Sequence, residues 1–391
     1  MRILLINDYG TATGGAELVC LRLREGLRAR GHDVRLFTSS AQPGGAPVLA
    51  DDQCYGTLGR HRTLLQAANP WARGRLTEVV RAFRPDVAHV RMFLTQLSPL
   101  VLDALNDVPT LLHVATYRPI CPLGTKRLPN GSPCASRPGR VCLREGCLPL
   151  RDWLPLMMQE RLWHDRRGRV DRVAANSAWV RHRLESEGMR VDMVVTNGVV
   201  ARPSRPSLAA PPTAAFAGRL QPEKGVRLLL EAFAAVVQDL PEARLLVVGD
   251  GPDHGELRAD AGRLGLTSHV SFLGHLERNQ MEEVLEPAWV HVVPSTWEEP
   301  FGTVAAEAMM RGTAVIASDH GGLPEQVRHD VTGLLVPPDD TEALTSALIR
   351  ILSDRGLAEA MGREGRQVAL RDFSHDRFVE DVEAAYRRLV G

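Results

Sequence analysis

Short aliphatic runs alternate with stretches of helical periodicity along the whole chain, and this alternation limits the possible folds more than any other feature. The runs are rich in Val, Leu, Ile and Ala, as expected for strands buried on both faces of a parallel sheet. Strands separated by helices form βαβ units, which build a doubly wound α/β sheet. The runs occupy residues 2–7, 33–38, 86–91, 110–115, 172–177 and 192–197, then 213–218, 243–251, 269–274, 289–295, 313–318 and 333–338.

A proline-rich stretch separates the two sets of runs. Residues 201–212 read ARPSRPSLAAPP, which can form neither a helix nor a central strand, and we interpret them as a linker. A chain of 391 residues is long for one domain. We therefore predict two Rossmann-like doubly wound domains, residues 1–200 and 213–372, facing an interdomain cleft at the carboxyl ends of their strands. Residues 373–391 have the spacing of a final helix.

The charge balance excludes some classes of protein. Lys and Arg together number 47, as do Asp and Glu, so the net charge of zero argues against a general nucleic-acid binder. The N-terminus MRILLIND has the pattern of a strand and lacks the features of a signal peptide, and no apolar run approaches the length of a membrane span. We expect a cytoplasmic protein. Lys126 and Lys224 are the only lysines, so each calls for a specific explanation.

Two stretches combine glycine or cations with the end of a predicted strand. The first, NDYGTATGGAE at 7–17, leaves the first strand and opens a helix, and Gly15 would let a phosphate approach the free N–H groups there; a plain strand-to-helix turn is the alternative. The second, AGRLQPEKG at 217–225, places Arg219 and Lys224 after the first strand of the second domain. These two cations would hold a diphosphate, unless they are ordinary surface charges.

A third stretch, STWEEPFGTVAAE at 295–307, places a turn before a helix. The amides of Phe301, Gly302 and Thr303 would be free in the first turn and suit ligand oxygens. Glu299 before the helix and Glu307 within it would accept hydrogen bonds from two sets of hydroxyls. The alternative is that the turn is an ordinary helix cap and the second glutamate a solvated surface residue. A fourth stretch, SDHGGLPE at 318–325, is either another ligand-facing turn or a simple connection.

Taken together, these motifs resemble family 4 glycosyltransferases of the GT-B fold. The resemblance is carried by GGAE, GHDV at 31–34, NGV at 197–199, GRLQPEKG, VVGDGP at 247–252, FLG at 272–274, EPFGTVAAEAMMRGTAVIAS and GGLPE. It implies a retaining, metal-independent transfer of a sugar from a nucleotide donor, UDP- or GDP-linked, to a glycan, lipid-linked or small-molecule acceptor. It also implies that the C-terminal helix crosses back to the first domain.

The resemblance also implies a role for each matching residue. Its donor-binding residues are Gly15, Arg219, Lys224, Leu276, Glu299, Phe301, Gly302, Thr303 and Glu307, and its catalytic residues are His113, Arg219, Lys224 and Glu299. Leu276 would contact the base through its backbone, and Glu307 would contact the ribose. The family's aspartate after the histidine is Val114 here, so His113 is equally well explained as a buried core histidine. There is no Asp-x-Asp, so cations and helix dipoles would stabilise the leaving group.

Residues 121–147 are unusual for this pattern. They contain Cys121, Cys134, Cys142 and Cys147 in a segment rich in Pro, Gly and Arg. Four thiolates can bind a structural zinc ion, but the spacings are irregular and no Cys-x-x-Cys occurs. We keep zinc as one hypothesis for this loop, which also contains Lys126.

Residues 153–183 combine apolar side chains with seven arginines. Peripheral association with the inner membrane surface would explain this composition, and a solvated helix face is the simpler explanation. Two other functions stay open. A non-catalytic nucleotide-sugar-binding protein would share the same residues. A nicotinamide oxidoreductase is suggested by VVGDGPDHG, although no acidic residue ends the following strand.

Overall fold

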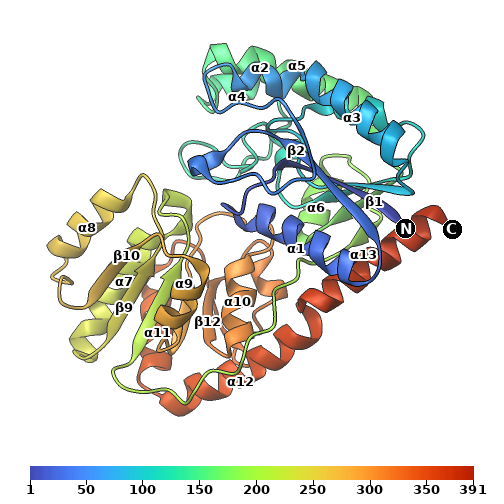
Figure 1. Ribbon diagram of the computed structural model, residues 1–391. Coiled ribbons are helices and arrows are strands. Elements are labelled where there is room, and N and C mark those ends of the chain that lie inside the picture. Colours follow the sequence, from blue (N-terminus) through green and yellow to red (C-terminus); the bar gives the residue numbers. More distant parts are fainter. The chain divides into compact units, whose positions relative to one another are not determined.

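The computed structural model describes residues 1–391, and the chain forms two compact units. Unit 1 comprises residues 1–198 and 375–391, and unit 2 comprises residues 199–374 (Figure 1). Each unit is built around one parallel sheet, which confirms the predicted α/β class with two doubly wound sheets.

The sheet of unit 1 has seven parallel strands in the order β3-β2-β1-β4-β5-β6-β7. The order reverses between β1 and β4, so the loops that follow these two strands lie at the point where ligands of such sheets usually bind. The strands are β1 Arg2–Tyr9, β2 Asp33–Ser39, β3 Asp52–Cys54, β4 Val87–Val90, β5 Thr110–Val114, β6 Arg172–Ala175 and β7 Met193–Val194.

The helices of unit 1 follow the βαβ pattern, with short 3-10 turns between them. α5 contacts both α2 and the turn η2, so these elements form a layer over one part of the sheet. The helices are α1 Gly15–Ala29, α2 Arg62–Ala67, α3 Pro70–Phe83, α4 Arg140–Arg144, α5 Leu150–Arg166, α6 Ala178–Ser186 and α13 His375–Val390; the turns are η1 Pro43–Gly45, η2 Pro99–Leu105, η3 Arg118–Ile120 and η4 Arg167–Arg169.

The C-terminal helix α13 packs in unit 1, beside α1 (Figure 1). Phe378 and Val382 lie in the same buried cluster as the apolar side of α1 and strands β1 and β2. The hydroxyl of Tyr386 lies 2.6 Å from Nδ1 of His89 on β4, and both side chains are fully buried. The helix is therefore part of the core of unit 1, although 176 residues of unit 2 precede it (199–374).

The sheet of unit 2 has six parallel strands in the order β10-β9-β8-β11-β12-β13. Its order reverses between β8 and β11, so the loops after these two strands meet at the carboxyl edge. The strands are β8 Thr213–Ala217, β9 Arg244–Val248, β10 Val270–Gly274, β11 Val290–Val293, β12 Ala314–Ser318 and β13 Gly333–Val336.

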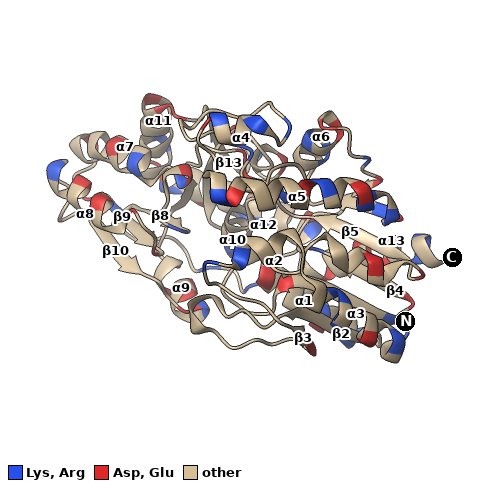
Figure 2. Cartoon of the chain, turned by 90° about the horizontal axis from the view of Figure 1, so that it is seen from above, with Lys and Arg blue, Asp and Glu red and all other residues tan.

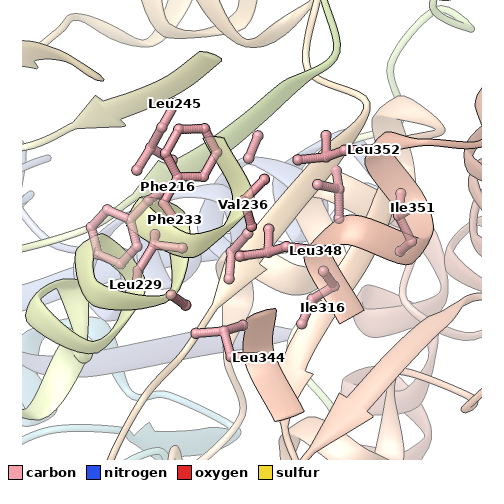
Figure 3. Close-up of a cluster of buried hydrophobic side chains, with 14 of the residues drawn as sticks. Phe216, Leu229, Phe233, Val236, Leu245, Ile316, Leu344, Leu348, Ile351 and Leu352 are labelled. Atoms are coloured by element: carbon pink, nitrogen blue, oxygen red, sulfur yellow. The ribbon is translucent and has the colours of Figure 1, made fainter. Parts of the chain in front are cut away.

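The largest buried cluster of unit 2 lies between its sheet and helices α7 and α11. Val236 of α7 lies near Leu348 of α11 in this cluster (Figure 3), which also contains Phe233, Leu344 and the strand residue Phe216. The helices are α7 Val226–Asp239, α8 His254–Arg263, α9 Arg278–Leu285, α10 Thr303–Arg311, α11 Thr341–Leu352 and α12 Arg355–Asp372; the turns are η5 Pro222–Lys224 and η6 Leu323–Glu325.

The proline-rich stretch 201–212 contains no helix or strand and is packed onto unit 2. Leu208 is buried in the main core of that unit. The guanidinium of Arg205 donates to the backbone carbonyls of Glu286 and Ala288, and the indole of Trp289 donates to the carbonyl of Ala209. The stretch that we interpreted as a linker is therefore packed along unit 2.

Candidate functional site

Lys224 and Glu299 form an ion pair at the carboxyl edge of the unit 2 sheet. Lys224 ends the turn η5 after β8, and Glu299 lies in the loop after β11, which is the neighbouring strand. The Nζ atom of Lys224 lies 2.5 Å from Oε1 of Glu299, and only 9% of the Glu299 side chain is exposed. The fold thus joins two residues that are 75 positions apart at the place where the strand order reverses.

The surroundings of Glu299 keep its carboxylate ionised. Ser295 donates its hydroxyl to Oε1 at 2.8 Å, and the side chain of Trp297 makes a further hydrogen bond. Burial alone would raise the pKa of Glu299, but the charge of Lys224 and these hydrogen bonds outweigh it and hold the pKa below its ordinary value. Lys224 also lies 5.2 Å from the centre of the Trp297 ring.

Glycines allow the loops around this pair to pack closely. Gly225 has φ +70° and follows Lys224; a Cβ there would lie 1.8 Å from the carbonyl oxygen of Pro294. Gly321 has φ +67°, and a Cβ there would lie 2.6 Å from the amide nitrogen of Glu299. The amide of Gly322 donates to the carbonyl of Glu299 at 2.7 Å. The stretch 318–325 therefore supports the Glu299 loop, which explains its two glycines without requiring that they touch a ligand.

The first turn of α10 offers free donors beside Glu299. The backbone N–H groups of Phe301, Gly302 and Thr303 have no acceptor within the protein, as the sequence led us to expect. Gly302 has φ +85° and forms the N-cap, while the Phe301 side chain is buried against Phe373. The buried ring fixes the loop, and the free N–H groups suit an anionic or hydroxyl oxygen.

The other donor-binding residues predicted in unit 2 lie along the same edge of the sheet. Arg219 lies two residues after the end of β8 and is exposed. Its side chain makes no hydrogen bond or ion pair. Leu276 is half-buried in the loop between β10 and α9. Glu307 on α10 is little exposed, so its carboxylate requires a charged partner. Nη2 of Arg278 lies 2.9 Å from its Oε1.

In unit 1, the glycine-rich loop runs from β1 into α1. Gly14 is the N-cap, and a Cβ there would lie 2.1 Å from Oε2 of Glu17. A Cβ at Gly15 would meet no atom within 4 Å, so nothing inside the unit requires a glycine there. An external ligand at the helix N-terminus would explain this residue.

His113 at the end of β5 is a fully buried histidine with both ring nitrogens engaged. Nε2 lies 2.8 Å from the carbonyl of Val195, and Nδ1 lies 3.2 Å from Nη1 of Arg91. Because arginine only donates, Nδ1 accepts and Nε2 carries the proton. Burial, the charge of Arg91 and neighbouring His89 hold the pKa of His113 well below 6.5. These contacts match the core-histidine alternative, so we do not include His113 among the proposed catalytic groups.

The four clustered cysteines are not arranged as a metal site in this structure. All of them are free and partly exposed, and no group of three or more His, Cys, Asp or Glu side chains in the chain is arranged to hold a metal ion. The zinc hypothesis is therefore not supported. Lys126 instead orders the segment: its Nζ lies 2.6 Å from Oε1 of Glu187 and 2.6 Å from the carbonyl of Ser136. Both lysines of the chain thus form close ion pairs with a glutamate.

The stretch VVGDGPDHG, which resembles a dinucleotide-binding motif, packs closely against the backbone of the protein. A Cβ at Gly249 would lie 1.8 Å from the carbonyl oxygen of Gly218, and one at Gly251 would lie 2.2 Å from that of Leu220. These glycines are needed for packing against the loop after β8. They give no support to a nicotinamide site.

Sequence reasoning missed several groups that complete the site. Ser295 and Trp297 lie within four residues of Glu299, so their position in the sequence could have indicated that they contact it. His320 donates through Nε2 to the carbonyl of Ser295 at 2.8 Å. Arg278 lies 29 residues before Glu307, and no local pattern pairs the two.

Comparison with known families now identifies the chain. Residues 14–199 match the model described as "Glycosyl transferase 4-like domain", and residues 201–368 match "Glycosyl transferases group 1". The chain belongs to glycosyltransferase family 4. The two matched segments together cover most of this family 4 chain, and each lies almost wholly in one of its two units.

Curated relatives of this family 4 chain match it over part of their length. A phosphatidyl-myo-inositol mannosyltransferase of Mycobacterium leprae is 34% identical over 218 residues, 54% of this chain and 57% of the relative. A D-inositol 3-phosphate glycosyltransferase of Kribbella flavida is 38% identical over 182 residues, 44% of this chain and 42% of the relative. The chain thus spans about half the length of the curated relatives it matches.

Solved structures extend the likeness to the whole fold. Sucrose-phosphate synthase from Thermosynechococcus elongatus has a TM-score of 0.77 at 24% identity and covers 100% of this chain and 99% of its own. Anabaena HepE in complex with UDP-glucose has a TM-score of 0.70 at 20% identity, with 100% of both chains covered. The family 4 chain therefore has the GT-B glycosyltransferase fold.

Proposed function

We propose that this chain is a retaining, metal-independent glycosyltransferase that moves a sugar from a nucleotide diphosphate donor to an acceptor hydroxyl. The observation that carries this proposal is the Lys224–Glu299 pair at the carboxyl edge of unit 2, beside the unpaired guanidinium of Arg219 and the free amides at the start of α10. These groups supply positive charge and N–H donors for a diphosphate and one acceptor for sugar hydroxyls.

In this proposal the breaking bond lies between the anomeric carbon and the diphosphate oxygen. Negative charge grows on the diphosphate, and Lys224 and Arg219 offset it. Glu299 is already hydrogen-bonded and paired, so it suits the role of holding sugar hydroxyls better than that of a free nucleophile. The leaving phosphate would then accept the proton of the attacking hydroxyl on the same face of the sugar, which retains the configuration.

The remaining donor contacts follow the family resemblance. The amides of Phe301, Gly302 and Thr303 would bind oxygens of the donor, and Glu307 would accept from the ribose after exchanging part of its contact with Arg278. Leu276 would read the base through its backbone. Gly15 is a separate candidate for a phosphate contact, supported by its open position at the N-terminus of α1.

A ligand panel tests the donor proposal. We expect UDP-glucose or a GDP-sugar to raise the melting temperature of the protein, because a ligand that binds only the folded state stabilises it by about 2.7 kcal/mol at a hundredfold excess over Kd. NADH should produce no shift. Differential scanning fluorimetry with UDP-, GDP-, ADP- and TDP-sugars measures this, and the absence of any shift would refute the proposal. Turnover of the sugar that binds separates an enzyme from a non-catalytic binding protein.

The acceptor is proposed to be a hydroxyl of a glycan, a lipid-linked molecule or a small polyol. The names of the two curated relatives refer to phosphatidyl-myo-inositol and D-inositol 3-phosphate. Both are polyhydroxy compounds that carry phosphate, and we propose the same chemical class here.

We further propose that unit 1 docks on an anionic membrane from the cytoplasmic side. Leu150, Leu154 and Met158 form one stripe along α5 and are 66%, 67% and 47% exposed; Leu64 on the adjoining α2 is 57% exposed. Arginines lie along the same helix, together with acidic residues (Figure 2). Apolar side chains flanked by arginines suit the surface of an anionic bilayer. None of the helices has the length and apolar character that spanning a membrane would require.

Vesicle binding tests this surface. The protein should co-sediment with vesicles containing phosphatidylglycerol, and about 0.5 M NaCl should reduce the bound fraction, because salt screens the arginines. The variant Leu150→Ser/Leu154→Ser should lose most of the binding, whereas Leu264→Ser on unit 2 should not. Equal binding by both variants would contradict the assignment.

A further inference from the structure

A pocket in unit 1 has the features of a second ligand site. Its volume is about 300 Å³, which lies at the lower end of the range for small-molecule sites. It lies between the turn η3, the segment that contains the cysteines, the C-terminal half of α5 and the end of α6. A smaller pocket of about 160 Å³ in unit 2 differs from it, because the arginines Arg205 and Arg366 there already donate to backbone carbonyls.

One face of α5 supplies the polar groups of this pocket. Glu160, His164 and Arg167 follow one another at spacings of four and three residues, so they lie on the same side, with Trp163 beside them. Arg161 borders the pocket next to Glu160. The buried Trp163 also lines the pocket. A hydrogen bond from its indole to the carbonyl of Pro119 fixes its position.

Three charged side chains on the α5 side of the pocket make no hydrogen bond or ion pair within the protein. The side chains of Arg161 and Arg167 make no ion pair or hydrogen bond, and the carboxyl of Glu160 makes no hydrogen bond. Burial raises the pKa of Glu160 to about 7, although the charges of Lys126 and Arg167 oppose the rise. Guanidinium groups without a partner in a partly enclosed pocket suit a phosphate, which they bind through paired N–H donors.

The opposite wall of the pocket is held rigidly. The buried ion pair between Lys126 and Glu187 joins the cysteine-containing segment to the end of α6. Arg137, which also lines the pocket, lies 3.8 Å from the second oxygen of Glu187. Because Lys126 is only 1% exposed in its side chain, this pair shapes the wall and is not itself available to a ligand.

We propose that this pocket binds a small phosphorylated polyhydroxy compound, with Arg161 and Arg167 on its phosphate and Glu160 on its hydroxyls. Under the proposed function, on which this role rests, such a compound is the sugar acceptor. In this proposal, Lys126 and the cysteine-containing segment form one wall of the ligand pocket.

Calorimetric titration of the intact protein with glucose 6-phosphate, inorganic phosphate and glucose tests the proposal. We expect glucose 6-phosphate to bind at least tenfold more tightly than the other two. The variant Arg161→Gln/Arg167→Gln should weaken this binding at least tenfold. Arg151→Gln, the same substitution on the same helix outside the pocket, should change it less than twofold. Each variant should keep the melting temperature of the wild type and the shift in it caused by the nucleotide sugar. Failure of the donor proposal would appear as the absence of that shift, independently of the binding of glucose 6-phosphate.

The pH dependence supplies a second readout. Ionised Glu160 repels a phosphate, so glucose 6-phosphate should bind less tightly as pH rises through about 7. The facing groups Lys126, Arg137, Arg167, His164 and Glu187 are unchanged in Glu160→Gln, so binding by this variant should fall less with rising pH than binding by the wild type. Equal affinity for glucose and glucose 6-phosphate, or unchanged binding in the double arginine variant, would overturn the proposal.

Discussion

The variant Lys224→Ala should transfer sugar about 10²- to 10⁴-fold more slowly than the wild-type chain. Lys224 is the closest cation to Glu299 and lies at the switch point of the unit 2 sheet. Removing one preorganised donor that stabilises developing charge commonly costs about two to three orders of magnitude. Because a full positive charge next to the leaving diphosphate is lost here, the effect can exceed that range by up to about tenfold. Steady-state rates with the nucleotide sugar found in the ligand panel measure it.

The stability of this variant must be measured together with its rate. Removing one partner of a buried ion pair costs about 3–5 kcal/mol, because the other charge stays buried without compensation. Lys224→Arg keeps the charge and should recover part of the rate. Arg227→Ala, an exposed cation three residues later on α7, is the matched control and should leave the rate within about twofold. Wild-type turnover by folded Lys224→Ala would refute the diphosphate role.

The variant Glu299→Gln should lose at least about 10²-fold in kcat/KM. Glutamine has nearly the same shape, but its neutral amide attracts Lys224 less and accepts more weakly from sugar hydroxyls. If Glu299 holds the transferred sugar, the loss appears in kcat as well as in KM, because the contact positions the reacting carbon. Glu256→Gln on α8, whose side chain is 73% exposed, is the matched control.

The pH dependence of stability gives Glu299→Gln a second signature. The folded state holds the pKa of Glu299 below 4.5, so the carboxylate contributes stability above pH 4.5 that is lost as pH falls through its lower folded pKa. Thermal melts between pH 3 and 7 should therefore show a shallower acid decline in the variant than in the wild type. Identical acid slopes together with wild-type turnover would remove Glu299 from the site.

Much of the fold follows from local sequence. Each predicted strand corresponds to a strand of the structure, because runs of buried aliphatic residues are recognisable within five or six positions. The helix that the stretch 7–17 was expected to open runs from Gly15 to Ala29. The edge strand Asp52–Cys54 was missed, because three residues are too few to show a period. The run 192–197 forms only the two-residue strand Met193–Val194 at the other edge.

Other features depended on contacts that no local pattern contains. His113 matched a family motif, yet Arg91 and Val195 occupy both of its nitrogens. The four cysteines are close in sequence, but the ion pair of Lys126 and Glu187 in their segment joins positions that no local pattern pairs.

The sequence by itself was enough to select the residues that we propose for the chemistry of this protein: the cations after one strand, the glutamate before a helix and the glycines that let loops approach. The tertiary structure alone decided their partners. Lys224 meets Glu299 because β8 and β11 are neighbours in the sheet, and Tyr386 meets His89 because α13 packs in unit 1. Periodicity and capping act over a few residues, whereas strand order and close packing join positions that are 75 and 297 residues apart.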